Sequence, residues 1–326
     1  MHRIIASVLS DPALAAAREA FKEVEVVDAL APFFPGEKLR RVNVRVLRHR
    51  KGRRALIAYT LYFGRPRGGA KRTVLLAKAY RGERASHVFD VLGQAHAAAL
   101  ASTSRFRTPA PIALLEDWGV VVFEKMDGFP VTTKSRTSDF ACTGSAIAAF
   151  HAAQMHFEEF RKPEDELGDA ATWIHEASKV SAKLPAAGEF VLRHLQRAVS
   201  SLESEQTRPL HRDFYPAQVL VGHGAPAFID LDDAAMGGAA MDAGNFLAHL
   251  SMFPEPSRRR AGAAFINALR CNEALPQSNL RFYLVASLVR IAGVHAVRYG
   301  DTRLATRLIG VAERLVRESQ SLSIPV

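Results

Sequence analysis

Hydrophobic and polar positions alternate along the segments that follow the first 40 residues. Val42–His49 places apolar residues between basic ones, and Ala55–Phe63 is an apolar run with β-branched and aromatic side chains. Patterns of this kind predict β-strands. Because Gly52 lies in the basic segment between the two runs, we expect a hairpin. A turn region at Gly64–Gly69 precedes a third expected strand, Thr73–Tyr80, so the pattern predicts an antiparallel sheet of successive strands.

Helical spacing flanks this predicted sheet. We expect one helix over Asp11–Leu30, where Asp11-Pro12 is a start signal and Pro32 a stop signal, and another over Ala85–Ala101. Two apolar segments, residues 111–115 and 118–126, predict further strands. The front of the chain is therefore expected to be rich in β-structure.

The rest of the chain has mostly helical periodicity. It predicts helices over Asp139–Met155, Ala171–Leu184, Glu189–Leu202, Ser257–Arg270, Asn279–Tyr299 and Thr302–Ser319. After Pro209 a strand–loop–strand pattern, residues 210–233, interrupts the helices, with a short turn at His223. The sequence thus predicts an α+β chain with a small β-rich part, residues 1–126, and a larger helical part, residues 127–326.

The composition is that of an ordinary globular protein. Of the 326 residues, 48 % are hydrophobic and 23 % are charged, which is enough apolar material for two modest cores. No apolar run reaches the ~18 residues of a membrane span, and a charged helical segment stands where a signal peptide would be cleaved. Cys142 and Cys271 each lack a neighbouring cysteine, so neither a disulfide framework nor a zinc knuckle is expected. These features predict a reducing, cytoplasmic setting without a membrane.

The net charge of +10 is concentrated in one region. Residues 35–85 contain 16 basic and two acidic residues, so the rest of the chain carries a net charge of −4. Such an excess is typical of an anion-binding lobe, a nucleic-acid surface or solvated strand edges. Aromatic residues are interleaved with the basic ones in a single strand, so a base-stacking surface is not expected and nucleic acid is not the expected partner.

An ordered set of polar residues lies within residues 210–233. It starts with His-Arg-Asp ending at Asp213, has Gln218 five residues later, and ends with Ile-Asp-Leu around Asp230. The set resembles the catalytic loop of the aminoglycoside phosphotransferase and choline kinase families, which starts with His-Gly-Asp or His-Arg-Asp. The Ile-Asp-Leu resembles their metal-binding Ile-Asp-Trp. The resemblance extends from the strand of Lys78 to about His249.

This resemblance implies a protein-kinase-like, two-lobed fold of class α+β. Residues 1–126 then form a small antiparallel N-lobe that binds ATP, and residues 127–326 form a helical C-lobe with the catalytic loop and the substrate site. The implied cofactors are Mg²⁺ and ATP, and the implied partner is a small-molecule hydroxyl substrate. Asp242 resembles the second Asp of the family, which ties the loop to the catalytic segment. It follows Asp230 by only twelve residues, which leaves little room for a peptide-docking platform and favours a small substrate.

Phosphoryl-transfer chemistry accounts for the residue types in this set. Transfer to a hydroxyl needs a carboxylate that orients the hydroxyl and accepts its proton, and Asp213 fits this role as the catalytic base. Magnesium needs hard oxygen ligands beside the phosphates, and Gln218 and Asp230 fit that role. The family usually has Asn where this chain has Gln218. Because relatives such as maltose kinases also have Gln there, we interpret it as a variant ligand.

The resemblance also implies nucleotide-binding residues in the N-lobe. Lys78 resembles the strand lysine that reaches the α- and β-phosphates, and a lysine in an apolar strand needs an anionic partner. Asp90 is expected to orient Lys78, with Glu83 as the alternative acid. Glu124 and Met126 lie at the expected junction of the lobes, where backbone N–H and C=O groups are expected to bind the adenine edge.

Two histidines and an acidic run are expected to be structural. His211 should hydrogen-bond the backbone around the loop, His151 should pack within its helix, and Glu158–Asp169 should be a solvated helix end and loop. Other functions stay open. A maltose kinase-like sugar kinase shares Gln218, and a nucleotide-binding pseudokinase with a regulatory role would fit both Gln218 and the absence of a GxGxxG loop.

Overall fold

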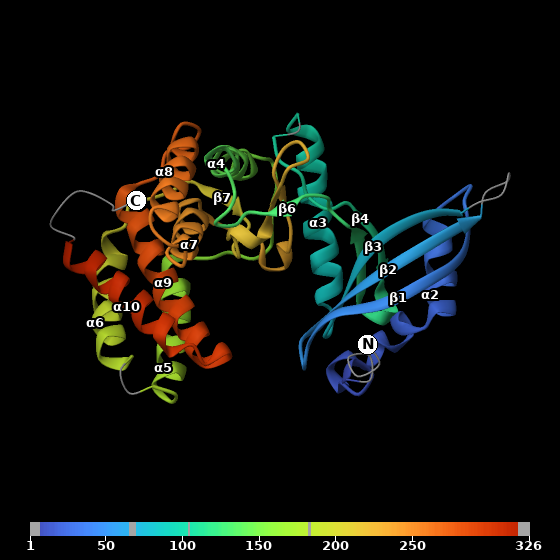
Figure 1. Ribbon diagram of the computed structural model, residues 1–326, viewed down its shortest axis with the longest axis horizontal. Coiled ribbons are helices and arrows are strands. Elements are labelled where there is room, and N and C mark those ends of the chain that lie inside the picture. The colour runs from blue at the N-terminus through green and yellow to red at the C-terminus, as the bar shows by residue number, and fades with distance from the viewer. Residues whose placement is uncertain (1–6, 65–69, 104, 182–183, 319–326) are drawn as a thin grey trace. The chain divides into compact units, whose positions relative to one another are not determined.

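Figure 1 shows the computed structural model, which describes residues 7–64, 70–103, 105–181 and 184–318. The chain forms two compact units. The first comprises Met1–Ala97 and Thr108–Asp127, and the second comprises Ala98–Arg107 and Gly128–Val326. An antiparallel sheet dominates the first unit and helices dominate the second, so the predicted α+β class is confirmed. The assignment of ATP binding to residues 1–126 and of the substrate site to residues 127–326 stays a prediction.

The described residues of the first unit form a five-stranded sheet. The strand order is β1-β2-β3-β5-β4, and every neighbouring pair is antiparallel. The bounds are Lys38–Arg50 (β1), Arg54–Gly64 (β2), Ala70–Tyr80 (β3), Pro111–Leu115 (β4) and Val120–Glu124 (β5). The predicted hairpin at Gly52 and the predicted third strand are confirmed. The turn expected at Gly64–Gly69 lies outside the described residues from position 65.

The single helix predicted over Asp11–Leu30 is wrong. The segment forms a 3-10 helix, Pro12–Phe21, and a separate α-helix, α2, Glu23–Leu30, with Lys22 in an extended conformation between them. The buried residues of the 3-10 helix repeat every third position, which suits three residues per turn better than 3.6. They are Leu14, Ala17 and Ala20.

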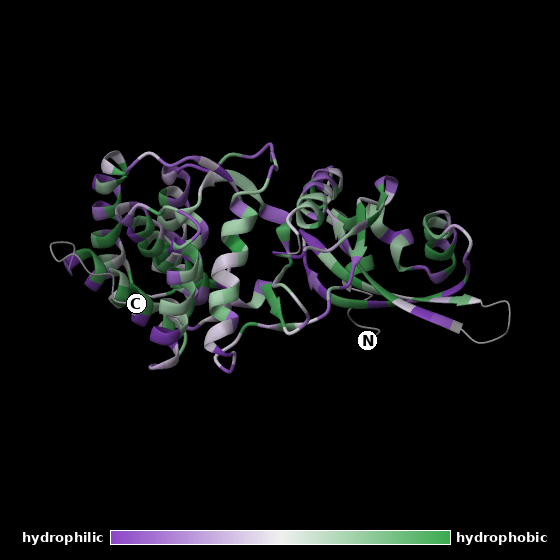
Figure 2. Ribbon diagram, turned by 90° about the horizontal axis from the view of Figure 1, so that it is seen from above, coloured by the Kyte–Doolittle hydropathy of each residue, from purple (hydrophilic) through white to green (hydrophobic). Residues whose placement is uncertain are grey.

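The sheet buries one face against these N-terminal helices. On β1, Val42 and Val46 are buried while the basic residues that alternate with them are exposed, and Figure 2 shows hydrophobic residues along the strands of this sheet. Ala77 and Ala79 of β3 belong to the same hydrophobic core. Because successive side chains of a strand point to opposite faces, Lys78 lies on the face opposite to the N-terminal helices.

A buried carboxylate ties the N-terminal segment to the β1–β2 turn. Asp11 Oδ2 accepts a hydrogen bond from the Gly52 N–H at 2.7 Å and lies 2.8 Å from His49 Nε2, and Oδ1 accepts from the Ala13 N–H at 3.1 Å. The hydrogen bond from Gly52 lowers the pKa of Asp11 below its usual range although burial opposes this. The Asp11 carboxylate therefore fixes the turn between the first two strands.

Helices make up most of the second unit. Their bounds are Thr137–His151 (α4), Pro163–Ser178 (α5), Pro185–Ala198 (α6), Ala240–Leu250 (α7), Ser257–Arg270 (α8), Gln277–Tyr299 (α9) and Thr302–Arg317 (α10). The helix α3, Arg84–Ala101, precedes them and matches its prediction. The last predicted helix is observed to Arg317, and its expected end at Ser319 lies outside the described residues.

Besides shifts of up to four residues at the ends of α4 and α6, two helices of this unit differ from the prediction. α5 begins at Pro163, eight residues before the expected start, because Pro163 occupies the first turn and Asp165 accepts a hydrogen bond from the Lys162 N–H at 2.8 Å. α7 was not expected. All of its residues except His249 are buried, so its sequence has no polar face to reveal a helical period.

The strand–loop–strand pattern forms two small sheets. β7 (Thr207–Leu210) pairs with β10 (Ala235–Gly238), and β8 (Val219–Val221) pairs with β9 (Ala227–Phe228) and with β6 (Phe129–Pro130). All of these pairs are antiparallel. The predicted hairpin between β8 and β9 is therefore confirmed, and it brings the segment after β9 back beside the loop after β7.

α9 is the central helix of the second unit. α5, α7 and α10 all pack against it, as the labels in Figure 1 help to follow. In the described part of the chain it is the one helix that is long and apolar enough to cross a membrane, but 72 % of its most apolar stretch is buried inside the unit. Such burial is typical of the core helix of a globular unit.

Candidate active site

The carboxylate of Asp242, in the first turn of α7, holds the loop that follows β7. Oδ2 accepts a hydrogen bond from the His211 N–H and Oδ1 accepts one from the Arg212 N–H, both at 2.8 Å. Arg212 has φ +70°, a left-handed conformation that is rare for a side chain of this size. Strain of this kind persists only where surrounding contacts fix it, and it is common at active sites. The expectation that Asp242 ties the loop to the catalytic segment is confirmed.

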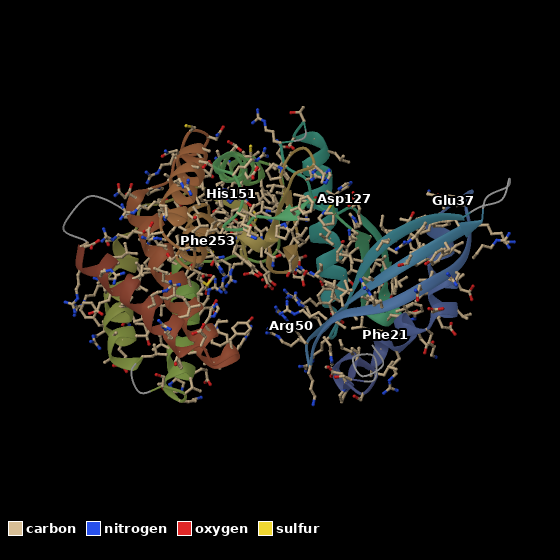
Figure 3. All side chains as sticks on the ribbon, viewed as in Figure 1. Phe21, Glu37, Arg50, Asp127, His151 and Phe253 are labelled. Atoms are coloured by element: carbon tan, nitrogen blue, oxygen red, sulfur yellow. The ribbon has the colours of Figure 1, made fainter. Side chains whose placement is uncertain are left out.

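His151 of α4 braces Asp242 from the other side. Its Nε2 lies 3.1 Å from Asp242 Oδ2 and its Nδ1 lies 2.7 Å from Glu273 Oε2. Burial disfavours the charged ring, but the two carboxylates outweigh burial and raise the pKa of His151 to about 9. Figure 3 shows His151 among the helices of the second unit. The expected packed, structural role of His151 is confirmed, with the addition that the ring is a buried cation.

The ring of His211 connects two segments of the site. Its Nε2 donates to the carbonyl oxygen of Ile229 at 3.0 Å, and the ring packs against Phe214 and Phe228. The expected hydrogen bond to the backbone is thus confirmed. Because Ile229 immediately precedes Asp230, His211 fixes the spacing between the loop and the Asp230 segment.

Asp213 is held by its backbone on both sides. Its N–H donates to the His211 carbonyl at 2.9 Å, and the carbonyl of the next residue, Phe214, accepts from Asn245 Nδ2 at 2.9 Å. No group in the described part of the chain donates a hydrogen bond to its half-buried carboxylate. Burial raises the pKa of Asp213, and the charge of Arg290 opposes this rise. A raised pKa brings a carboxylate closer to the range in which it acts as a general base at neutral pH.

Gln218 and Asp230 are brought into contact. Gln218 Nε2 donates to Asp230 Oδ2 and to the Tyr215 hydroxyl, both at 3.1 Å, and the Gln218 carbonyl accepts from the Ile229 N–H at 3.0 Å. Asp230 has φ +64°, the second strained backbone in this set. The amide nitrogen therefore faces the carboxylate, so the amide oxygen of Gln218 is the atom that could bind a metal.

This pair is a small donor set for a metal. Among residues 7–318 where they are described, no group of three or more His, Cys, Asp or Glu side chains could hold a metal ion. Mg²⁺ commonly uses one or two carboxylates together with substrate phosphates and water. One carboxylate and one amide oxygen therefore suit Mg²⁺ that is also coordinated by nucleotide phosphates. They are too few for a metal ion that is coordinated by side chains alone.

Lys78 belongs to the first unit. It stands on β3 opposite Leu56 of β2 and Val121 of β5, and only 9 % of the residue is exposed. Its Nζ lies 5.8 Å from the centroid of the Phe123 ring, a cation–π contact. A lysine buried in the middle of a sheet is costly unless it serves an anion, as the sequence predicts.

The other predicted nucleotide-binding residues also lie in the first unit. Asp90 is on an exposed position of α3, and neither Asp90 nor Glu83 forms an ion pair within the described residues. The Glu124 N–H donates to the Ala110 carbonyl at 2.9 Å, so this donor is already used. Met126 follows β5 and is half-buried. The backbone of Met126 therefore suits the predicted adenine contact better than the N–H of Glu124.

The interpretation of Glu158–Asp169 as a solvated run is wrong for two of its acids. Arg161 and Arg212 each form ion pairs of 2.7–3.0 Å with Glu166 and Asp169, and Glu166 is only 5 % exposed. Glu166 and Asp169 of α5 thus pair with Arg212 of the loop after β7. Asp169 and Arg212 are 43 residues apart in the chain, so no local pattern indicates their contact. Sequence reasoning also missed Asn245 of α7, which contacts the same loop, and Arg290 of α9, which contacts Asn245.

Comparisons with known proteins identify the family and the fold of the chain. A sequence model described as the phosphotransferase enzyme family matches residues 67–278. No curated protein matches the chain. Three similar solved structures are a putative aminoglycoside phosphotransferase from Ralstonia eutropha, a choline kinase from Streptococcus pneumoniae, and a spectinomycin phosphotransferase in complex with ADP and spectinomycin.

All three share the fold over nearly the whole chain at low identity. For the Ralstonia protein the TM-score is 0.66 and the identity 14 %, with 90 % of this chain and 97 % of that chain covered. The choline kinase has a TM-score of 0.59, 10 % identity, and coverage of 90 % and 98 %. The spectinomycin enzyme has a TM-score of 0.60, 10 % identity, and coverage of 92 % and 99 %. The predicted protein-kinase-like fold is confirmed, and since the family model matches more than half of its residues, the chain belongs to the phosphotransferase enzyme family.

Proposed function

We propose that this chain is a small-molecule kinase that transfers the γ-phosphoryl group of ATP to a hydroxyl group, with Asp213 as the general base. The observation that carries the proposal is the state of the Asp213 carboxylate. It is half-buried, its backbone is fixed on both sides, and no described residue donates a hydrogen bond to it. A carboxylate that is held in position, and that accepts no hydrogen bond from the described residues, can accept one from a substrate hydroxyl.

The reaction follows from this placement. The acceptor hydroxyl donates its hydrogen bond to Asp213, and its oxygen attacks the γ-phosphorus. A new O–P bond forms, the bond between the γ-phosphorus and the bridging oxygen of ADP breaks, and the hydroxyl proton passes to Asp213. The hydrogen bond from the Asp213 N–H to the His211 carbonyl, and that from Asn245 to the Phe214 carbonyl, keep the carboxylate in place. Such positioning is the main contribution a protein makes to phosphoryl transfer besides charge stabilisation.

Gln218 and Asp230 would hold the magnesium. Asp230 offers a carboxylate, and Gln218 offers the amide oxygen opposite the nitrogen that contacts Asp230. When bound, Mg²⁺ neutralises the charge that builds up on the phosphate oxygens. The chain's own contribution is to hold these two side chains at a fixed spacing, through the Gln218 carbonyl and the Ile229 N–H.

The nucleotide-binding residues belong to the same proposal. Lys78 would bind the α- and β-phosphates, and the backbone of Met126 would bind the adenine edge. Support comes from the burial of Lys78 and from the similar spectinomycin phosphotransferase, whose structure is in complex with ADP. Asp90 stays the candidate acid for orienting Lys78, and the role of Glu124 is limited to its carbonyl and side chain because its N–H is used.

ADP release and Mg-ATP binding together test the proposal. The wild-type protein should bind ATP only with Mg²⁺ in calorimetric titration, and should release ADP when a hydroxyl acceptor is added. Mg-ATP binding without transfer to any acceptor or to water would favour the pseudokinase. Transfer confined to maltose and related sugars would identify a maltose kinase-like enzyme. The absence of both Mg-ATP binding and phosphoryl transfer would contradict the proposal.

A further inference from the structure

Arg290 of the core helix α9 is linked to the loop of Asp213 through Asn245. Its Nη2 donates to Asn245 Oδ1 at 2.6 Å, and Asn245 Nδ2 donates in turn to the Phe214 carbonyl at 2.9 Å. Phe214 directly follows Asp213. One intervening side chain therefore links the guanidinium of Arg290 to the residue beside the proposed base.

A glycine allows this link. α7 and α9 pack closely at Gly244, where an added Cβ would lie 2.6 Å from the Leu284 backbone nitrogen. This close approach places Asn245, the next residue of α7, against Arg290, which follows Leu284 on α9 by less than two turns. Residues 282–289 of α9 are all buried, and Arg290 is half-buried. Residues 291–293 are buried again, so Arg290 is a half-buried position within an otherwise buried stretch of α9.

The guanidinium of Arg290 forms no ion pair with any described residue. Of its five N–H donors, Nη2 supplies one to Asn245, while Nε is buried without an acceptor. In the described part of the chain no carboxylate forms an ion pair with Arg290, although Arg161 and Arg212 each have two. A partly buried cation without an anion is costly, so this arrangement favours an anion supplied by a ligand.

Arg290 acts on Asp213 through its charge but forms no hydrogen bond or ion pair with it. Burial raises the pKa of Asp213, and Arg290 is foremost among the charges that oppose this, so the two groups are near each other. They nonetheless form no ion pair. A molecule with a hydroxyl on Asp213 and an anionic group on Arg290 would satisfy both.

The ring of His249, which Arg290 influences, adds no charge to the site. The His249 ring stacks on Tyr215 with centroids 4.5 Å apart, and burial lowers the pKa of His249 to about 3, so the ring is neutral. The charge of Arg290 also lowers the pKa of His249. Burial lowers the pKa of His295, against the charge of Asp301 after the end of α9, so Arg290 is the permanent cation among these groups. A positively charged, amine-bearing acceptor would need a negatively charged side chain in the place of Arg290.

We propose that Arg290 binds an anionic group of the phosphate acceptor, so that the substrate is a hydroxy compound that bears a carboxylate or a phosphate. This inference rests on the proposed function and specifies the acceptor of that same site. It separates this chain from the similar choline kinase and spectinomycin phosphotransferase, which are named for cationic compounds.

Phosphoryl transfer to matched acceptors tests the proposal. The probes are glycerol, glycerate and glycerol 3-phosphate; glucose, gluconate and glucose 6-phosphate; and choline and spectinomycin as cations. In each triple, kcat/KM for at least one anionic member should exceed that of the neutral member by about 10- to 100-fold, the value of a charge-assisted hydrogen bond. The carboxylate and phosphate members of each triple show which anion is recognised.

The variants are Arg290→Met and, as a matched control on the same helix, Arg298→Met. Arg298 lies over the Trp173 ring, 4.7 Å from its centroid, and is exposed. Arg290→Met should reduce the preference for anionic acceptors to near one, while Arg298→Met should keep it. Arg290→Lys should restore part of the preference, which a role confined to holding Asn245 would not predict.

The outcomes separate this inference from the proposed function. Preference for neutral or cationic acceptors, an anionic preference that persists in Arg290→Met, or transfer to no probe with Mg-ATP binding intact would each overturn the role of Arg290 in the acceptor site. Loss of Mg-ATP binding in the wild-type protein would instead overturn the phosphotransferase itself. Thermal unfolding of each variant checks that the fold is retained.

Discussion

Gln218 Nε2 donates a hydrogen bond of 3.1 Å to Oδ2 of Asp230, which joins the two residues proposed to hold magnesium. The contact fixes the amide so that its nitrogen faces the carboxylate and its oxygen remains for the metal. Gln has one methylene more than the Asn usual in the family, and the left-handed backbone of Asp230 sets where the carboxylate stands. The structure therefore shows Gln218 and Asp230 in one arrangement rather than at separate sites.

We predict that Gln218→Asn keeps more activity than Gln218→Ala. Asn retains an amide oxygen, whereas Ala leaves that coordination position to water, so the magnesium midpoint of the Ala variant should rise by about 10- to 100-fold. Raised magnesium should restore part of its activity. The measurement is ADP release across a magnesium titration for the three proteins. His223→Gln, on the exposed turn of the β8–β9 hairpin, is the control.

Equal magnesium midpoints in all three proteins would remove Gln218 from the metal site. Loss of activity in both variants without magnesium rescue would point to a bracing role for Gln218, through its contacts with Tyr215 and Asp230.

The strands and the proximity of the candidate catalytic residues could be predicted from the sequence because their signals are local. Alternation along β1 reflects one buried face, and the spacing of Asp213, Gln218 and Asp230 lies within a single strand–loop–strand. α7 could not be predicted, because a helix buried all round has no polar face to mark its period.

Contacts between segments far apart in the chain could not be predicted from the sequence, for a different reason. Arg290 meets Asn245 from another helix, and Asp11 meets Gly52 across 41 residues. Each pair consists of common residue types in unremarkable local settings, and tertiary packing alone selects them. The break at Lys22 is similar, because packing against the sheet overrides helix propensity there.

We predict that His151 makes the stability of the second unit depend on pH. The pKa of His151 is raised from 6.5 to about 9 by Asp242 and Glu273 against the opposing effect of burial, so the folded protein holds a proton that the unfolded chain has lost. This contribution is fully present below pH 6.5 and is lost as the pH rises through 9. The free energy of unfolding should therefore fall between pH 6.5 and 9, by about 3 kcal/mol at most.

Urea denaturation at several pH values measures this effect. His151→Gln should be less stable than the wild type at pH 6.5 and should show a flatter dependence up to pH 9. His175→Gln, an exposed histidine of α5, is the control and should match the wild type. An identical pH dependence in His151→Gln and the wild type would show that the ring is not a buried cation.

We predict that Asp11→Asn weakens the first unit. The carboxylate of Asp11 accepts from two backbone N–H groups and contacts His49, so its loss should lower the free energy of unfolding by about 1–3 kcal/mol at neutral pH. The pKa of Asp11 is lowered below 3.8, chiefly by the Gly52 N–H. Asp11 therefore stabilises the fold at pH values above the pKa that it has in the unfolded chain. This stabilisation is lost as the pH falls through the lower pKa that Asp11 has in the folded protein.

Acid unfolding followed by circular dichroism checks this prediction. Asp11→Asn should show less loss of stability below pH 4 than the wild type, while Asp28→Asn, an exposed acid of α2, should behave as the wild type does. Equal stability of Asp11→Asn and the wild type at pH 7 would mean that the Asp11 contacts contribute nothing.

Turnover of Asp213→Asn, measured beside its affinity for Mg-ATP, tests the proposed function most directly. The base acts on the acceptor and not on the nucleotide, so the variant should lose about 10²- to 10⁴-fold in kcat with the acceptor that the wild type phosphorylates. Its calorimetric affinity for Mg-ATP should stay within about threefold of the wild type. An Asp213→Asn protein that retains most of its turnover would contradict the account.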